Sequence, residues 1–214
     1  MKKVDSFQDL ELREDLLRGV YGYGLKQLSE IQTKCIMPII SSEPPLDVVC
    51  ISSSGTGKKT AFSIALLQRI DLDHQAYSKG APQALVITPT REMSQVISNH
   101  IKKLAHYLDV KVLPFHGGVS TKETIQALNE IQHVVVGTNK LMDLIRFKVL
   151  NLKYLKLIII DRTGCDWLDM YDQQILRIIN ASNKFNLQIC VFGDSRNIGS
   201  IEQYLKDPIY CELE

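Results

Sequence analysis

Residues 52–60 read Ser-Ser-Ser-Gly-Thr-Gly-Lys-Lys-Thr, directly after the apolar run 48–51 and directly before a stretch with helical spacing. A strand that ends in a glycine-rich turn before a helix points several backbone N–H groups at one place, where an anion binds. Gly55 and Gly57 allow close approach of the backbone, and Lys58 offers a cation to terminal phosphates. The stretch therefore predicts a phosphate-binding loop. The residues predicted to bind a nucleotide here are Ser54, Gly55, Thr56, Gly57, Lys58, Lys59 and Thr60.

One position in this loop departs from the usual pattern. A serine or threonine normally follows the lysine, because its hydroxyl binds the magnesium ion that accompanies the phosphates. In this chain that position is Lys59. We therefore expect a phosphate-binding loop with a weakened magnesium site. If the loop is taken alone, a glycine-rich structural turn is the alternative.

The composition is that of an ordinary globular protein. Of the 214 residues, 45% are hydrophobic and 23% are charged, which suits one large domain. The formal net charge of +1 excludes a strongly basic protein but no local basic patch. No apolar run of about 18 residues and no signal-peptide core occur, so neither membrane insertion nor secretion is predicted. Five widely spaced cysteines fit reduced thiols, and we expect a cytoplasmic protein, with the nucleus as the alternative.

Strand and helix patterns alternate along most of the chain. Short runs rich in valine and isoleucine, typical of buried parallel strands, occupy 47–52, 84–88, 111–115, 133–136, 156–160 and 188–192. Amphipathic stretches predict helices over 12–23, 29–40, 58–71, 91–107, 120–130, 140–147 and 170–181. The alternation predicts an α/β fold in which about six or seven strands form a central parallel sheet with helices on both faces. We expect ligands at the carboxyl ends of the strands, with Asp161 on a strand next to that of the loop.

Three groups of residues near the N-terminus carry a resemblance to a known family. Ser6-Phe7, Tyr23-Gly24-Leu25 and Ile31-Gln32 are similar to the adenine-reading motif of the DEAD-box ATP-dependent RNA helicases. The resemblance implies that Gln32 hydrogen-bonds the adenine edge and that Phe7 stacks on the ring. It covers nearly the whole chain and implies the first of two RecA-like domains, a P-loop NTPase fold. We therefore expect residues 1–45 to form a helical segment with this motif and residues 46–214 to form the RecA-like domain, with the second RecA-like domain absent from these residues.

Further motifs resemble the parts of this family that grip the RNA backbone. Pro89-Thr90-Arg91 follows the strand predicted at 84–88, and a glycine pair follows the strand predicted at 111–115. Thr138 ends a segment that begins like the next RNA motif. The residues that the resemblance assigns to RNA are Pro89, Thr90, Arg91, Gly117, Gly118 and Thr138. From the residues alone, Thr90 is equally a natural helix N-cap.

The motifs that carry the chemistry of the family are altered. Where the family has Asp-Glu-Ala-Asp, this chain has Asp161-Arg162-Thr163-Gly164. The resemblance implies that Asp161 binds magnesium through water. Arg162 replaces the glutamate that activates the attacking water, and an arginine accepts no proton. The family's Ser-Ala-Thr motif is also missing from residues 191–195. ATP and magnesium are the implied cofactors, with magnesium binding weakened and no catalytic residue assigned.

Three functions fit these observations. The preferred one is a degenerate helicase module, a pseudoenzyme that binds single-stranded RNA and ATP but hydrolyses ATP poorly. An active RNA helicase would need Thr60 to serve the magnesium and an acid such as Asp166 to orient the water. A protein-interaction scaffold, as in Tudor-linked helicase-like proteins of germline small-RNA silencing, would keep only the fold. The implied partners are single-stranded RNA, other proteins and a second RecA-like domain in the full-length chain, and a cytoplasmic RNA granule is a further expected location.

Lys59 and Arg162 suggest a mechanism for the loss of hydrolysis. Each places a fixed positive charge where the family has a metal-binding or acidic side chain. We hypothesise that these cations hold the phosphates in place of magnesium, so that binding becomes independent of metal. The competing hypothesis is that Lys59 pairs with Asp161 across the metal position and excludes the nucleotide.

Overall fold

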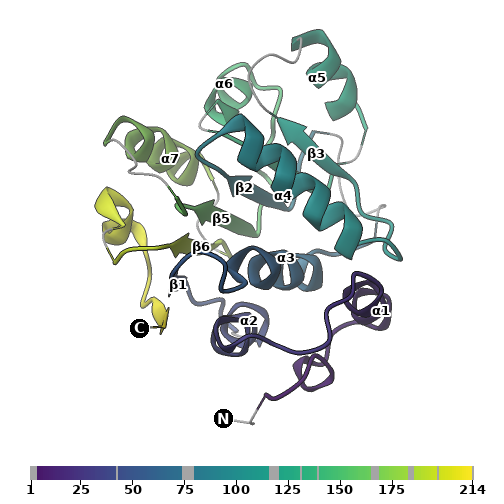
Figure 1. The fold of residues 1–214 in the computed structure, drawn as a ribbon. Helices are drawn as coiled ribbons and strands as arrows, with labels where there is room; N and C mark the ends of the chain where they lie inside the picture. The colour runs from purple at the N-terminus through teal and green to yellow at the C-terminus, as the bar shows by residue number, and fades with distance from the viewer. Residues whose placement is uncertain are drawn as a thin grey trace.

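A seven-stranded parallel sheet runs through the centre of the computed structural model (Figure 1). The structure describes residues 4–41, 43–73, 80–115, 121–130, 132–138, 140–164, 169–182, 186–196 and 198–213. The strands are β1 (Val48–Ile51), β2 (Ala84–Ile87), β3 (Val112–Phe115), β4 (Val134–Gly137), β5 (Leu157–Asp161), β6 (Gln188–Gly193) and β7 (Ile209–Glu212). They lie in the order β3-β4-β2-β5-β6-β1-β7, and every neighbouring pair is parallel. The predicted α/β fold with a parallel sheet is confirmed.

The two faces of the sheet supply two separate hydrophobic clusters. Successive residues of a strand point to opposite faces. Val48 and Cys50 of β1 therefore enter one cluster, while Val49 and Ile51 enter the other. All residues of β2, β4, β5 and β6 are buried, which is the pattern of strands covered on both faces. This is why the strands appear in the sequence as continuous apolar runs.

Helices cover both faces of the sheet, as Figure 1 shows. The first cluster receives side chains from α1 (Glu14–Gly22), α2 (Glu30–Ser41), α3 (Lys58–Arg69) and α4 (Arg91–Leu104). The second receives them from α6 (Leu141–Arg146), α7 (Asp169–Ala181) and the 3-10 helix η3 (Gly199–Tyr204). The structure also has α5 (Thr121–Leu128) and the short η1 (Gln8–Leu10). Among the described residues, no helix has both the length and the apolar character needed to cross a bilayer.

The N-terminal helices share the hydrophobic core of the sheet. Leu16 of α1 and Ile36 of α2 are fully buried in the cluster that also contains side chains of α3 and α4. Helix α1 approaches α4 so closely that a Cβ atom on Gly19 would lie 2.0 Å from the backbone oxygen of Leu104. The segment before β1 is thus packed into the same core, and this packing places the start of α2 beside the phosphate-binding loop.

Two features of the sheet differ from the expectation. The sequence analysis does not predict β7, because this edge strand is only partly buried and lacks a continuous apolar run. The second difference concerns Asp161, which ends β5. Strand β6 lies between β5 and β1, so Asp161 is not on the strand next to that of the loop, and the expected adjacency is wrong. The residues that follow β6 therefore come between the loop and Asp161.

Candidate nucleotide and RNA site

The backbone of the loop between β1 and α3 has the conformation that its glycines allow. Gly55 has a φ of 84° and Gly57 a φ of 107°, in the left-handed region that other residues rarely adopt. Gly57 is the N-cap of α3, so the loop leads directly into the first turn of a 12-residue helix. The unpaired N–H groups of that turn, together with the helix dipole, favour an anion at this point. The predicted strand, glycine turn and helix are present, and phosphate binding by this loop stays a prediction.

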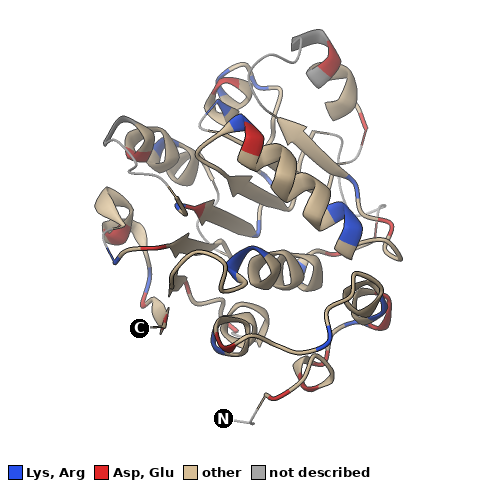
Figure 2. Cartoon of the chain, viewed as in Figure 1, with Lys and Arg blue, Asp and Glu red and all other residues tan. Residues whose placement is uncertain are grey.

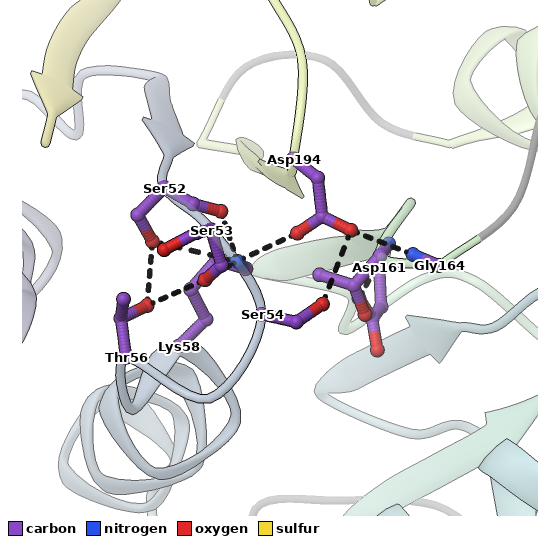
Figure 3. Close-up of polar contacts among 9 residues, drawn as sticks. Ser52, Ser53, Ser54, Thr56, Lys58, Asp161, Gly164 and Asp194 are labelled. Carbon is purple, nitrogen blue, oxygen red and sulfur yellow. Dashed lines mark hydrogen bonds and ion pairs between the residues drawn. The ribbon is translucent and has the colours of Figure 1, made fainter. Parts of the chain in front are cut away.

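Lys58 lies buried in this loop and is bonded within the protein. Its side chain is 5% exposed. Its Nζ atom donates to the backbone oxygen of Ser52, to the backbone oxygen of Ser53 at 2.8 Å, and to Oδ1 of Asp194 at 2.8 Å (Figure 3). An ammonium group has three N–H donors. The described contacts therefore use the full donor capacity of Lys58.

Asp194 follows β6 and connects three segments at this edge of the sheet. Its second carboxylate oxygen, Oδ2, accepts a hydrogen bond from the backbone N–H of Gly164 at 2.8 Å and one from the Ser54 hydroxyl at 3.5 Å. Figure 3 shows the carboxylate between the loop and the end of β5. Burial acts to raise the pKa of the Asp194 carboxyl, but the bonds from Lys58 and Gly164 outweigh it and hold the pKa below its ordinary value. Asp194 is thus held as an anion.

Thr60 faces away from the mouth of the loop. Its hydroxyl lies 3.2 Å from Nε2 of His100 on α4, and Nδ1 of the same ring lies 3.1 Å from the Tyr23 hydroxyl. Burial, assisted by the nearby charges of Lys59 and Lys103, lowers the pKa of His100 to about 4. A neutral imidazole therefore engages the hydroxyl that the active-helicase alternative would need as a magnesium ligand.

Asp161 is buried at the end of β5, and its carboxylate bonds to Thr163, two residues further along the chain. Its Oδ1 atom accepts hydrogen bonds from the backbone N–H and the hydroxyl of Thr163, at 3.1 Å and 2.7 Å. Burial raises the pKa of the Asp161 carboxyl, and the bonds from Thr163 offset only part of this effect. The competing hypothesis of a Lys59–Asp161 pair is not supported, because the ion pairs of the described residues do not include it.

The residues at this edge do not fit a magnesium ion. Magnesium requires oxygen ligands in nearly ideal octahedral geometry. The position after Lys58 carries an ammonium group, the Thr60 hydroxyl is bonded to His100, and Asp161 is a carboxyl with a raised pKa. Within the described parts of the chain, no group of three or more His, Cys, Asp or Glu side chains could hold a metal ion.

Arg162 does not face the loop. Its Nη1 atom lies 2.6 Å from Oδ1 of Asp172 on α7, and the two side chains are 10% and 3% exposed. Asp172 also accepts a hydrogen bond from the backbone N–H of Ser200 at 3.1 Å. The structure does not support the hypothesis that Arg162 holds phosphates in place of magnesium, because the guanidinium forms an ion pair with a buried carboxylate on α7. The role proposed for Lys59 stays a prediction.

Gln32 and Phe7, the two residues expected to contact adenine, lie in different surroundings. Gln32 lies beside the loop, where its Nε2 atom donates to the backbone oxygen of Gly57 at 3.4 Å and its Oε1 atom accepts from the Ser29 backbone N–H at 2.9 Å. Phe7 is fully buried, and its ring meets Tyr21 edge-on at 6.2 Å between centroids. The expected stacking of Phe7 on adenine is thus not available here, because the ring is part of the core.

The candidate RNA residues lie at the ends of adjacent strands. Pro89, Thr90 and Arg91 follow β2, and Thr138 follows β4, its direct neighbour. The Thr90 hydroxyl accepts a bond from Met93 N, which confirms that Thr90 caps α4. Arg91 is exposed, whereas Thr138 is buried, and Figure 2 shows a basic and then an acidic position at the start of α4. Gly117 and Gly118 lie outside the described residues, as does Asp166.

Three residues that shape this site carry no assignment from the sequence: Asp194, Asp172 and His100. Asp194 had a signal, because a carboxylate directly after a buried strand lies at the edge where ligands bind. Asp172 and His100 had none, because each lies within an amphipathic helix. Their roles depend on which helix covers which strand end.

Comparison with known proteins places the chain among helicases. Residues 29–193 match the family model described as DEAD/DEAH box helicase. The ATP-dependent RNA helicase eIF4A of Kluyveromyces lactis is 36% identical over 213 residues, which are 97% of this chain and 51% of that protein. Eukaryotic initiation factor 4A of Caenorhabditis elegans is 40% identical over 159 residues, which are 74% of this chain and 38% of that protein. The chain thus spans about half the length, or less, of these curated relatives.

Solved structures share the fold. A DEAD box protein from the hyperthermophile Methanococcus jannaschii matches with a TM-score of 0.86 at 25% identity, over 98% of this chain and 56% of that chain. S. cerevisiae Dbp5 bound to RNA and ADP BeF3 matches with a TM-score of 0.82 at 25% identity, over 99% of this chain and 52% of that chain. The fold and the loop therefore define a RecA-like domain of the P-loop NTPase class. More particularly, the chain belongs to the DEAD/DEAH box helicase family and is a DEAD-box RNA helicase domain.

Proposed function

We propose that this chain is an RNA-binding module of the DEAD-box type in which ATP hydrolysis is impaired. The observation that carries the proposal is the ion pair between Arg162 and Asp172. The position that aligns with the water-activating glutamate of the family holds a cation, and that cation is fixed to α7. The relative from Kluyveromyces lactis is an ATP-dependent RNA helicase. In this chain Arg162 stands where the family has the residue that activates the attacking water, and Arg162 forms a structural ion pair instead.

The expected loss of rate is large. General-base catalysis contributes about 10² to 10⁴ in rate, and Arg162 accepts no proton. The magnesium site is weakened separately, because Lys59 replaces its hydroxyl ligand and Thr60 is bonded to His100. Side-chain cations do not reproduce the geometry that a metal imposes on the β- and γ-oxygens. Two independent supports of the transition state are therefore missing.

RNA binding is proposed for the edge formed by the ends of β2 and β4. Exposed Arg91 and the first turn of α4 offer a cation and backbone N–H groups, the partners that a phosphate backbone uses. In the solved structure of S. cerevisiae Dbp5, RNA and ADP BeF3 are bound together. We further propose that the full-length protein has a second RecA-like domain, protein partners and a cytoplasmic location.

An active helicase is the alternative function. It would require Thr60 to turn from His100 toward the loop, which breaks the hydrogen bond at 3.2 Å and leaves a buried ring nitrogen without its partner. It would also require another acid to take the place of the glutamate. These two rearrangements make the alternative less favourable than the impaired module.

The test measures ATP turnover and RNA retention in the full-length protein, with magnesium and with chelator. We expect retention of single-stranded RNA that falls with salt, and turnover indistinguishable from a Lys58→Met variant in which the loop cation is removed. RNA-stimulated, magnesium-dependent turnover would instead establish the active helicase. A protein that retains no RNA at low salt and does not turn over ATP would fit the protein-interaction scaffold.

A further inference from the structure

We propose that Asp194 decides which ligands the phosphate-binding loop accepts, because its carboxylate takes the place of a phosphate on Lys58. The inference deepens the proposed function and rests on it in treating this loop as the nucleotide site. It assigns to a residue outside the recognised motifs the role of discriminating against polyphosphate ligands.

Lys58 has no N–H group left for a further acceptor. Each of its three N–H groups already has an acceptor, two of them backbone oxygens of the loop and the third Oδ1 of Asp194. The two backbone oxygens, of Ser52 and Ser53, belong to the loop itself and remain in place when the loop keeps its shape. A phosphate oxygen can therefore reach Lys58 only by displacing the carboxylate of Asp194.

Both oxygens of the Asp194 carboxylate accept hydrogen bonds. Oδ1 accepts from Lys58, while Oδ2 accepts from the Gly164 backbone N–H and, at 3.5 Å, from the Ser54 hydroxyl. Two of these three donors, Lys58 and Ser54, belong to the loop that would otherwise bind phosphate. An exposed ion pair contributes little, but here the Lys58 side chain is 5% exposed and that of Asp194 is 32% exposed, and the carboxylate joins segments that follow three different strands. The contact is thus part of the architecture of the site (Figure 3).

The negative charge of Asp194 also opposes the binding of phosphates. The Asp194 carboxylate neutralises the cation that attracts phosphates, and once displaced it remains close to them as a like charge. The penalty grows with the charge of the ligand, so ATP is disfavoured more than adenosine. Gln32, on the other side of the loop, bonds to Gly57 and is independent of Asp194. A change at Asp194 should therefore alter the affinity for ATP and leave the affinity for adenosine as it is.

The experiment is calorimetric titration of the protein with ATP and with adenosine, in chelator, for the wild type and for Asp194→Asn and Asp194→Ala. We expect both variants to bind ATP about tenfold or more tightly than the wild type, with adenosine affinity unchanged. Asp109→Asn is the matched control, because it removes the same charge from a 73% exposed side chain far along the sequence. It should leave both affinities unchanged.

A double variant shows whether Asp194 acts through Lys58. The gain in ATP affinity should vanish when Asp194→Asn is combined with Lys58→Met, and circular dichroism verifies that the variants fold. ATP affinity within twofold of the wild type in both Asp194 variants, an equal gain for adenosine, or no measurable ATP binding by any variant would overturn the proposal. RNA retention and turnover are measured separately, so a failure of the proposed function leaves the ratio of ATP to adenosine affinity readable.

Discussion

The Nη1 atom of Arg162 and the Oδ1 atom of Asp172 are 2.6 Å apart in an almost fully buried ion pair. Gly199 packs against the same carboxylate, since a Cβ atom there would lie 2.1 Å from Oδ2 of Asp172. The pair thus ties the end of β5 to α7 and to η3. Arg162, which the resemblance to the family places at the position of a glutamate, is a structural link between three elements.

Removing the carboxylate should destabilise the fold. Asp172→Asn removes the carboxylate from a buried ion pair with Arg162, and breaking such a pair costs about 3 to 5 kcal/mol. Urea unfolding followed by circular dichroism measures the change. Arg177→Ala is the control on the same helix, because that side chain is exposed and its loss should change stability by less than about 0.5 kcal/mol. Equal effects of the two substitutions would contradict the structural role of the pair.

Restoring the glutamate alone should not restore turnover. Arg162→Glu places two carboxylates where the ion pair stands, and we expect a less stable protein with no gain in magnesium-dependent ATP hydrolysis. The charge-swapped variant, Arg162→Glu with Asp172→Arg, should recover part of the lost stability. Unfolding curves and phosphate release report the two properties. Full activity in the single variant would show that Asp172 does not constrain this position.

The contact between α1 and α4 gives a matched pair of glycine substitutions. Gly19→Ala would place a Cβ atom 2.0 Å from the backbone oxygen of Leu104, and a backbone atom moves only if the helices separate. We expect a loss of about 1 to 3 kcal/mol. Gly22→Ala meets only the Tyr107 ring at 3.6 Å, an ordinary contact, and should be neutral or slightly stabilising. Thermal unfolding distinguishes the two, and similar midpoints would argue against this close packing.

Most of the fold could be predicted because its signals are local. Five of the strands, β1, β2, β4, β5 and β6, are short apolar runs buried on both faces, and the glycines of residues 52–60 specify their own backbone geometry. β7 escaped prediction because an edge strand needs no continuous apolar run. The burial of Phe7 could not be predicted either, because the sequence around a single aromatic residue does not show whether a later helix covers it.

The partners of the site residues could not be predicted from the sequence. Lys58 and Asp194 are 136 positions apart and meet only because β6 lies between β1 and β5. The sequence shows the positive charge of Lys58, but which carboxylate neutralises that charge depends on the order of the strands. The same holds for Arg162, whose partner is on α7. The sequence predicts an excess of cations at this edge of the sheet. In the fold, Asp194 neutralises Lys58 and Asp172 neutralises Arg162.

His100 should make stability depend on pH. Its pKa is lowered from 6.5 to about 4 in the fold, so between these values the unfolded chain binds a proton that the folded protein does not. The free energy of unfolding should therefore fall as the pH falls from 6.5 to 4, by about 3 kcal/mol from this group. Urea unfolding across this range should show a shallower slope for His100→Asn. His106→Asn, an exposed site, is the control and should keep the wild-type slope.

The last prediction concerns the RNA surface at the start of α4. Arg91 is exposed beside the N-cap of the helix, and its substitution removes no hydrogen bond of the cap, which belongs to Thr90. Arg91→Ala should therefore fold normally, retain less single-stranded RNA at low salt and lower the slope of log affinity against log salt by about 1, the value for one lost phosphate contact. Lys102→Ala removes the same charge from the other end of α4 and should leave retention unchanged. Thr90→Ala is a poorer probe, because loss of the cap costs about 1 kcal/mol of stability. If Arg91→Ala and Lys102→Ala retain RNA equally, the phosphate backbone does not bind at this edge of the sheet.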